Sequence, residues 1–545
     1  MSALATVLIP LILALMLAAP AALRQLSYWL APWAPLLLLW PLASAGEIVL
    51  DWPLLGLGLA LDEGSRPLAL LCAVAWTLAG WLARDRIDRN RRWFWSGWLL
   101  ALTGMHLLLL ADKLAAFYVG YAILSLSAYL LVTHARSEQA WRAGRIYLIM
   151  ALAGEASILI GVLLLAGQLG NPSFDELRQA ADVLMGSSAR WFLLAGFAVK
   201  LGIIPLHVWL PLAHPVAPVP ASAILSGVIV KAGLLGCLRM VPALATDPLW
   251  LGHALLALGL LTTFGGALLG LTQSRIKTVL AYSTISQMGL VLSGFSLLFL
   301  LPGERETILG IIGLLALHHG LNKLALFMSC ANEPGSSRWR LLLFALPALA
   351  LCAVPLSTGF LAKTALKYAL QSTPASAATV VLLTLSSMST ALLMWKAFTL
   401  ARQMKSNDRK AVHPAWVLAV LAAIILPWWS AWQMGLEGTF STANLIDGIW
   451  PLLLAISLVT LHARLLPAAR INVPEGDLLV AVESLFKHRP SSPGAGLRFR
   501  PARPGWRLPL GRWLRQLEQA QRRLPVAGLI MLLIGGLLWL LTEAA

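Results

Sequence analysis

The sequence predicts an all-α, polytopic membrane protein, and three observations support this prediction. Hydrophobic residues make up 59% of the 545 residues and charged residues only 12%, whereas a soluble globular chain carries about 25% charged residues. Apolar runs of about 20 residues, long enough to cross a bilayer as α-helices, recur along the chain. Basic and acidic residues separate into alternate loops between these runs. An outer-membrane barrel would show short alternating segments instead.

Sixteen apolar segments are predicted to be membrane spans. The first has neither a basic leading region nor a clear small-residue cleavage site, so we interpret it as a span and not as a signal peptide. The twelfth is long and interrupted by proline. The predicted spans are residues 3–23, 29–45, 66–83, 93–111, 113–133, 146–168, 190–212, 219–241, 249–270, 278–301, 308–331, 341–370, 376–400, 412–432, 449–466 and 525–542.

The loop charges predict the orientation of these spans. Six of the eight segments that follow odd-numbered spans are basic, as in RDRIDRNRR at 84–92. Segments after even-numbered spans carry acidic residues instead, such as Asp175, Asp247 and Glu437. By the positive-inside rule both termini face outward, and we expect a multi-pass protein of a bacterial inner membrane. The net charge of +17 is therefore explained mainly by orientation and not by binding of nucleic acid.

The apolar runs and the loop charges divide the chain into five parts. The basic linker contains WRLPLGRWLRQLEQAQRRL, whose amphipathic spacing predicts a helix that lies on the headgroups or docks on a partner subunit. The predicted parts are N-terminal transmembrane helices (1–92), a core of transmembrane helices (93–410) that carries the intramembrane charges discussed below, C-terminal transmembrane helices (411–466), the basic cytoplasmic linker (467–524) and a final transmembrane helix (525–545).

Ionisable residues inside spans are the candidates for function, because a charge near the bilayer centre costs about 3 kcal/mol or more. Lysines near span ends reach the interface by snorkelling, which accounts for Lys113 and Lys367. Lys200 and Lys231 lie about ten and twelve residues into their spans, too deep for that. The full set is Glu155, Lys200, His207, Lys231, His318, His319, Lys323, Lys363 and Lys367, with Asp112 at a span boundary.

Spacing relates some of these residues to each other. His319 and Lys323 are four apart and share a helix face, whereas His318 points elsewhere and is interpreted as a packing histidine. His207 follows Lys200 by seven residues, nominally on the same face, although Pro205 intervenes.

Prolines break the helix that carries Lys200, in KLGIIPLHVWLPLAHPVAPVP at 200–220, and Lys363 follows the break PLSTGF. Broken helices survive in a membrane only where protein or water satisfies the freed carbonyls, and transporters use such breaks for ion sites. Water at a break would hydrate a neighbouring ammonium, so a row of lysines and histidines is predicted to relay protons. The alternative is that the prolines only kink packed helices, which leaves the accompanying lysines unexplained.

The sequence offers no cofactor, metal or catalytic site. Its four cysteines lie in apolar runs without CxxC spacing, and are interpreted as small buried residues. Iron–sulfur cysteine runs, Rossmann glycines, histidines at haem spacing and a nucleophile–base set are all missing from the sequence. Any redox chemistry is therefore expected in partners.

Several long motifs resemble the antiporter-like membrane subunits of respiratory complex I, a family that includes Mrp-type cation/proton antiporter and membrane-bound hydrogenase subunits. The resemblance covers roughly residues 93–370 and implies fourteen core helices in two inverted five-helix repeats, with helices seven and twelve broken. The motifs are LLLADKLAAFYVGYAILSLSAYLLV, VKLGIIPLHVWLPLAHPVAPVPASAILSGVIVKAG, LTQSRIKTVLAYSTISQMGL, LHHGLNKLALF and GFLAK.

The resemblance also implies roles for individual residues. Lys200 matches the broken-helix lysine and Lys231 the lysine of helix eight. The remaining matches are His319 and Lys323 with the pair of helix eleven, Lys363 with the outlet-side lysine of helix twelve, Glu155 with an acidic residue of helix six, and Asp112 with an acidic residue that opens helix five.

Two departures from the family pattern bear on coupling. Where the family carries an aromatic residue followed by glutamate in helix five, this chain has Tyr121 and Ala122. Glu155 of the adjacent helix is the candidate replacement; otherwise the coupling step or the transported ion differs. GFLAKTA also lacks the acidic residue that often follows the lysine.

The leading hypothesis is a proton-conducting membrane subunit of a larger energy-coupling complex. Three alternatives stay open: an Mrp-type subunit that exchanges sodium for protons, a membrane subunit that energises inorganic-carbon uptake beside a zinc-containing cytoplasmic protein, and a scaffold whose transport has decayed. Ala122 keeps the scaffold alternative open, but the retained lysines argue against it.

Overall fold

The structure is a computed structural model that describes residues 2–44, 48–50, 56–180, 188–244, 247–373, 377–404, 411–436, 440–465 and 473–474. The chain divides into two compact units, Met1–Asp477 and Leu478–Ala545. The described residues all belong to the first unit. The predicted span at 525–542 and the predicted linker helix lie outside the described residues.

The first two predicted spans are organised differently from the prediction. The helix α1 (Ser2–Met16) ends early, and α2 (Ala21–Leu30) begins directly after Pro20. Residues 3–23 are therefore not one continuous helix, since proline disfavours the α conformation in the residue before it. The helix α2 and the following η1–α3 segment meet at 58°. The segment comprises η1 (Ala34–Leu38) and α3 (Leu39–Ala43).

A short antiparallel pair, β1 (Ile48–Leu50) and β2 (Leu57–Leu59), precedes the first set of packed helices. Counted from α5, which follows α4, α5 and α6 form the leading packed pair of this set, and its fourth span is broken between α10 and α11. The elements are η2 (Glu63–Ser65), α4 (Arg66–Arg86), α5 (Arg91–Leu110), α6 (Leu114–Val132), α7 (Glu138–Leu169), α8 (Phe174–Gln179), α10 (Ala189–Leu201), α11 (Trp209–Val216), α12 (Val219–Ile224), the π-helical turn η3 (Leu225–Ile229) and α13 (Lys231–Met240).

The second set follows the same order as the first. Two packed helices come first, and the fourth span is again broken, here between α17 and α18. The elements are α14 (Leu249–Leu271), α15 (Ile276–Leu300), η4 (Pro302–Glu304), α16 (Arg305–Asn332), α17 (Arg338–Leu351), α18 (Thr358–Gln371) and α19 (Ala377–Arg402), followed by α20 (Pro414–Gln433) and α21 (Thr442–Leu465).

Glycines allow the leading pair of each set to approach closely. A Cβ on Gly104 of α5 would lie 2.5 Å from the Leu124 nitrogen of α6, and a Cβ on Gly289 of α15 would lie 2.4 Å from the Gly259 oxygen of α14. Small residues at such contacts let helix backbones touch, which supplies packing energy where lipid removes the hydrophobic driving force. The same device therefore opens both sets.

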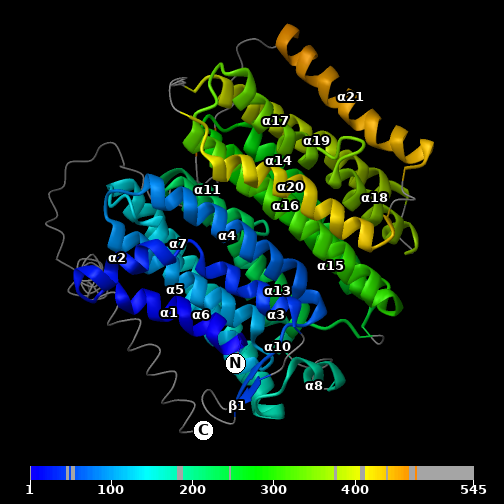
Figure 1. Cartoon of the computed structure of the whole chain (residues 1–545). Coiled ribbons are helices and arrows are strands. Elements are labelled where there is room, and N and C mark those ends of the chain that lie inside the picture. The colour runs from blue at the N-terminus through cyan, green and yellow to red at the C-terminus, as the bar shows by residue number, and fades with distance from the viewer. Residues whose placement is uncertain are drawn as a thin grey trace, which may run out of the picture. The chain divides into compact units, whose positions relative to one another are not determined.

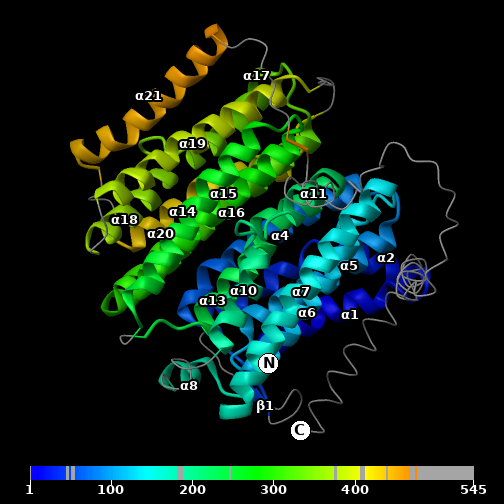
Figure 2. The same cartoon turned by 180° about the vertical axis from the view of Figure 1, so that it is seen from behind.

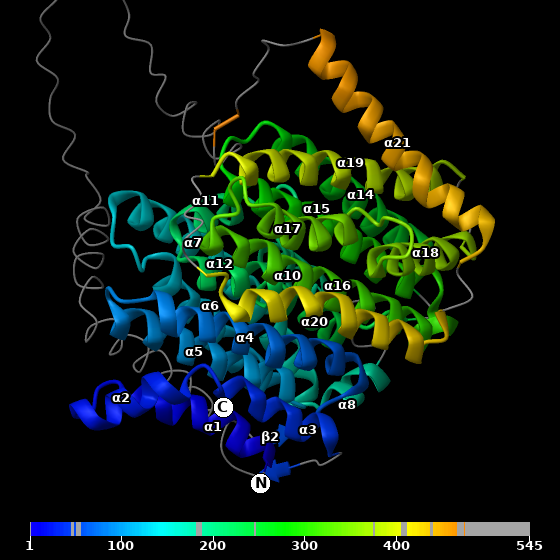
Figure 3. The ribbon, with the colours of Figure 1, turned by 45° about the horizontal axis from the view of Figure 1, so that its top comes forward.

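Burial places α12–α13, α15 and α16 at the centre, with the apolar windows of their spans wholly inside the protein. Figures 1 and 2 show α21 at one edge of this unit and α1 and α2 at the opposite edge, and Figure 3 shows α16 between α20 and the inner helices. Within the described residues, eleven helices are long and apolar enough to cross a membrane, or twelve if the bent pair counts as one span. The all-α polytopic prediction is confirmed.

Candidate functional site

Two breaks in helices introduce left-handed backbone turns, which are buried at Gly202 and Ala353 and exposed at Leu356. The helix α10 ends at Leu201, and Gly202 takes the left-handed φ of +71° that glycine adopts without strain. In the second set, Ala353 and Leu356 have φ of 59° and 68° between α17 and α18. The Ser357 hydroxyl then caps α18 by accepting a hydrogen bond from the Phe360 amide at 3.3 Å. Each break adjoins one of the predicted lysines.

Lys200 is the penultimate residue of α10, so its ammonium lies near the partially negative C-terminal end of a helix. Its side chain is buried and donates hydrogen bonds to the Ser125 hydroxyl and, at 3.4 Å, to the Tyr147 hydroxyl. The ammonium also lies 5.5 Å from the centre of the Tyr121 ring, within the range of a cation–π contact. Two hydroxyls and a ring face therefore contact this ammonium directly.

Glu155 of α7 lines the same small cavity as Lys200. The cavity measures about 10 Å³, which is room for about one water molecule. Ser125 interacts with the Glu155 carboxylate as well as with Lys200. One carboxylate oxygen, Oε1, has no hydrogen-bond partner among the described residues. Tyr121 also lines this cavity, so Glu155 places a carboxylate in the neighbourhood where Ala122 supplies none.

Lys231 and His319 meet at the centre of the unit. The Lys231 ammonium lies 2.7 Å from His319 Nδ1 and donates a 2.9 Å hydrogen bond to the Ser226 carbonyl. Ser226 lies in the π-helical turn η3, where the wider turn alters the regular helical ladder. This turn, which the sequence analysis did not predict, offers a backbone carbonyl to the lysine.

Lys323 lies one turn after His319 on α16, on the shared face that the spacing predicts. Its ammonium donates to the Leu280 carbonyl at 2.9 Å and to the Ser283 hydroxyl at 2.6 Å, both on α15. His319 Nε2 has no hydrogen-bond partner within the described part of the chain. The imidazole therefore has one nitrogen on Lys231 and one nitrogen available to a water or a neighbouring group.

Lys363 of α18 donates to the Ser387 hydroxyl of α19 at 3.1 Å. It lines a second cavity of about 30 Å³, room for about two waters, which Lys367 and Asp447 also line. Lys367 forms an ion pair with Asp447, whose side chain is 43% exposed. Lys367 thus has a charged partner on α21, and its own side chain is 13% exposed. The cavity leads from Lys363 toward a partly exposed carboxylate.

His318, predicted to be a packing histidine, makes polar contacts to the second broken helix. Its Nδ1 lies 2.7 Å from the Thr358 hydroxyl at the start of α18 and 3.1 Å from the Asn322 amide. It therefore connects α16 with the second broken helix. A signal for it was present in the adjacent pair His318–His319, because two consecutive histidines in a span face different neighbours.

Two further predicted residues lie in the first break and at a helix junction. His207 is buried in the first break, with its ring 6.2 Å from the Tyr282 ring of α15. Asp112 joins α5 to α6, where its amide donates to the Gly58 carbonyl at 2.9 Å and its own carbonyl accepts from Phe174 at 3.0 Å. Asp112 is thus placed at a helix junction and not among the central lysines.

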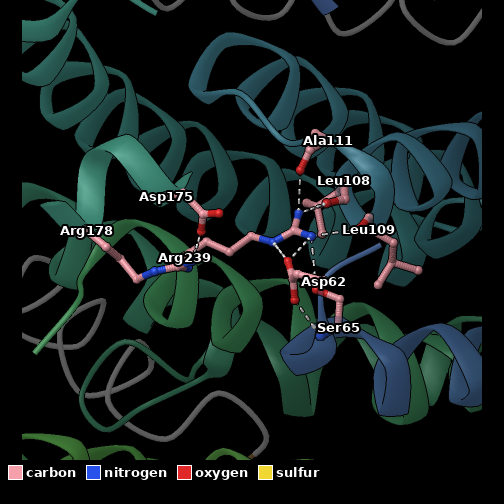
Figure 4. Close-up of polar contacts among 8 residues, drawn as sticks. All are labelled: Asp62, Ser65, Leu108, Leu109, Ala111, Asp175, Arg178 and Arg239. Atoms are coloured by element: carbon pink, nitrogen blue, oxygen red, sulfur yellow. Dashed lines mark hydrogen bonds and ion pairs between the residues drawn. The ribbon is translucent and has the colours of Figure 1, made fainter. Parts of the chain in front are cut away.

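Arg239, near the end of α13, is a buried charge that the sequence analysis overlooked. Its guanidinium donates to the Asp62 carboxylate at 2.8 Å and to the Ser65 hydroxyl at 3.0 Å (Figure 4). It also donates to three carbonyls at the C-terminal end of α5, at 2.7 Å, 2.8 Å and 2.9 Å. These carbonyls lack helical partners, so the arginine caps α5 with a cation. They belong to Leu108, Leu109 and Ala111.

The Arg239 cluster also fixes the ionisation of Asp62. Burial alone would raise the pKa of this carboxyl, but the Arg239 charge and hydrogen bonds from Ser65 and Arg239 together hold its pKa below the ordinary value. Figure 4 shows Asp175 and Arg178 of α8 beside this cluster, where they form an ion pair with each other. The cluster is therefore a structural clamp between the first helices and α13.

Paired broken helices and a central row of buried lysines and histidines define the class of antiporter-like membrane proteins. Residues 111–393, just over half of the chain, match the family described as NADH:quinone oxidoreductase/Mrp antiporter, TM. The chain belongs to this family, which confirms the resemblance that the motifs indicated.

Known relatives match part of the chain. Hydrogenase-4 component B of Escherichia coli (strain K12) is 36% identical over 227 residues, which are 41% of this chain and 34% of that protein. NAD(P)H-quinone oxidoreductase chain 4 2 of Microcystis aeruginosa (strain NIES-843 / IAM M-2473) is 33% identical over 292 residues, 51% of this chain and 50% of that protein. The matched part thus spans about a third to a half of the length of these curated relatives.

Two solved structures share the fold. One is the membrane-bound sulfane sulfur reductase, an archaeal respiratory membrane complex, with a TM-score of 0.69 and 21% identity over 84% of this chain and 99% of the other. The other is the Mrp complex from Dietzia sp. DQ12-45-1b, with a TM-score of 0.72 and 19% identity over 90% of this chain and 59% of the other. At these identities the likeness concerns the fold alone.

Proposed function

We propose that the chain is a proton-conducting membrane subunit of a larger energy-coupling complex. The contact between Lys231 and His319, buried at the centre of the unit, is the observation that carries the proposal. A hydrogen bond between Lys231 Nζ and His319 Nδ1 at 2.7 Å requires that one of the two nitrogens supply a lone pair. The pair therefore shares a proton and does not hold two, and two such groups in hydrogen-bond contact are suited to pass it between them.

The proposed route continues on both sides of this pair. Toward the first break, Lys200 and Glu155 line a cavity that holds about one water. Toward the second break, Lys323 shares a helix face with His319, and Lys363 lines the cavity that reaches the partly exposed Asp447. Serine hydroxyls contact three of these lysines, and a hydroxyl both donates and accepts hydrogen bonds. Water and hydroxyls are the proposed links between the titratable groups.

Glu155 is the proposed acidic partner of Lys200. The family pattern places this carboxylate in the fifth helix, at the position that Ala122 occupies here. The placement of Glu155 on the wall of the Lys200 cavity supports the substitution from α7. His207, buried in the first break beside the Tyr282 ring, is proposed as a further proton-transfer residue, and Asp112, at the junction of α5 and α6, as a further acidic residue.

The setting of the subunit is also proposed. Relatives are named as a hydrogenase component and a quinone oxidoreductase chain, and the structural neighbours belong to multi-subunit membrane complexes. We therefore propose other membrane subunits as partners, a bacterial inner membrane as the location, and outward-facing termini from the loop charges. A sodium/proton exchanger of the Mrp type is the second candidate, favoured by the fold shared with the Mrp complex.

Proton uptake by the intact complex tests the proposal. The complex, purified with its partners and reconstituted in liposomes, is energised by a potassium diffusion potential, and interior pH is followed with a fluorescent dye. Lys323→Met is expected to abolish uptake, whereas Lys396→Met, on α19 away from the row, is the matched control and leaves it unchanged. Uptake that is equal in both variants contradicts the proposal. Uptake that occurs only against sodium selects the second candidate.

A further inference from the structure

A large apolar crevice lies between α17, α19 and α21, away from the lysine row. It measures about 520 Å³, within the range of sites that hold small molecules. Its walls include Ala348 and Leu349 of α17, Met394 and Phe398 of α19, and Ile456 of α21. Apart from the Cys352 thiol, the Trp395 indole and the Thr460 hydroxyl, the lining side chains are hydrocarbon or thioether. Such walls offer almost no hydrogen bonds, so they suit a hydrocarbon chain.

Arginines stand at one end of this crevice. On α19 the lining residues Ala391, Trp395 and Phe398 follow helical spacing, and Arg402 continues the same stripe one turn further. On α17 the lining residue Ala345 lies seven residues, two turns, after Arg338. Both crevice-lining faces therefore end in an arginine.

The two arginines lie at the same end of the helix pair. The amide of Gly335, just before α17, donates to the carbonyl of Ala401, next to Arg402, at 3.2 Å. Both arginine side chains are exposed, and within the described residues neither has an ion-pair or hydrogen-bond partner. Guanidinium groups form bidentate hydrogen bonds with phosphate oxygens. The mouth of the crevice is thus suited to an anionic phosphate group.

We propose that the crevice is a binding site for one anionic phospholipid, with an acyl chain between α17, α19 and α21 and its phosphate at Arg338 and Arg402. Charge complementarity at the mouth selects this occupant over a neutral lipid or a partner helix. The inner end of the crevice lies at Cys352 and Val354, on either side of Ala353. Ala353 lines the Lys363 cavity, so the acyl chain would abut the second helix break.

Native mass spectrometry of the complex in nanodiscs tests this site. Nanodiscs contain equal phosphatidylglycerol and phosphatidylcholine, and retained lipid is counted after controlled activation. Wild type is expected to retain one phosphatidylglycerol with roughly 30-fold preference, because two arginines favour a lipid with a net negative charge over a zwitterionic one. The double variant Arg338→Ala/Arg402→Ala is expected to lose the preference, and Ala391→Phe, which fills the crevice, to lose the retained lipid.

The control is the double variant Arg86→Ala/Arg89→Ala, which removes two exposed arginines at and just after the end of α4. It removes the same amount of positive charge and is expected to behave as wild type. Equal loss in this control, or equal retention of both lipids by wild type, overturns the proposal. So does photo-crosslinking from position 395 to another membrane subunit in place of lipid. Monodisperse elution and unchanged thermal stability show that each variant is folded. Proton uptake is not the readout, so the result is independent of the proposed function.

Discussion

Removal of the Glu155 charge is expected to disable the first step of the proton route. Glu155 and Lys200 line a cavity that holds about one water, and a carboxylate and an ammonium bridged by one water would be separated by roughly 5.5 Å, two hydrogen-bond lengths. At an effective dielectric constant of about 20, their attraction is about 3 kcal/mol. Glu155→Gln removes this attraction while it keeps the shape of the side chain. If the ion pair stabilises the rate-limiting state, proton uptake falls by roughly 100-fold.

A second substitution that restores the carboxylate tests whether the loss of uptake comes from the missing charge. Ala122→Glu restores a carboxylate at the position where the family carries one, and in the Glu155→Gln background it is expected to recover most of the uptake. The assay is dye-detected proton uptake by the reconstituted complex under a potassium diffusion potential. Glu176→Gln, which removes an exposed carboxylate on α8, is the control. Normal uptake by Glu155→Gln alone would refute the assignment of Glu155 as the acidic partner.

Three further predictions concern the helix packing and its clamp. Arg239→Met is expected to destabilise the fold by about 2–3 kcal/mol because it leaves Asp62 unpaired and three α5 carbonyls uncapped, which thermal unfolding in detergent measures; stability equal to wild type contradicts the clamp. The pKa of Asp62 is lower in the folded than in the unfolded state, so its stabilising contribution is present above the ordinary aspartate pKa and is lost as pH falls through the folded pKa. Asp62→Asn is therefore expected to reduce the loss of stability at acid pH. A pH profile of stability equal to that of wild type contradicts this role of Asp62. Gly289→Leu is expected to prevent correct assembly, because its Cβ would lie 2.4 Å from the Gly259 oxygen; a folded, monodisperse variant contradicts the close approach.

Much of the fold followed from the sequence because membrane insertion imposes simple rules. Long apolar runs predicted the long helices from α4 onward, but not the short polar helix α8, and PLSTGF marked the break before Lys363. Prolines predicted a break after Lys200, although the turn begins at Gly202 and α11 contains Pro211 and Pro215. Pro211 lies in the first turn of α11, where the missing amide has no partner to lose, whereas Pro215 lies inside the helix, near its end. The prolines therefore indicated the region of the break more accurately than its limits.

Other features depend on tertiary contacts that no local pattern encodes. The π-helical turn η3 arises in LSGVI, an apolar stretch without proline, and becomes visible only where Lys231 donates to the Ser226 carbonyl. Spacing on α16 correctly paired His319 with Lys323, but the partner of His319 lies on a different helix. Arg239 escaped notice for the same reason, since its partners lie more than a hundred residues earlier in the chain. The spacing of residues on one helix does not predict which residue of a distant helix they contact.

The most direct measurement of the central claim is a double-mutant cycle on the Lys231–His319 pair. Proton uptake is measured for the reconstituted complex with Lys231→Met, with His319→Phe and with both changes. Because the two groups are proposed to act in series on one proton, each single variant is expected to lose uptake and the double variant to lose no more than either. Single variants that retain normal uptake, or losses that multiply in the double variant, would contradict the shared route.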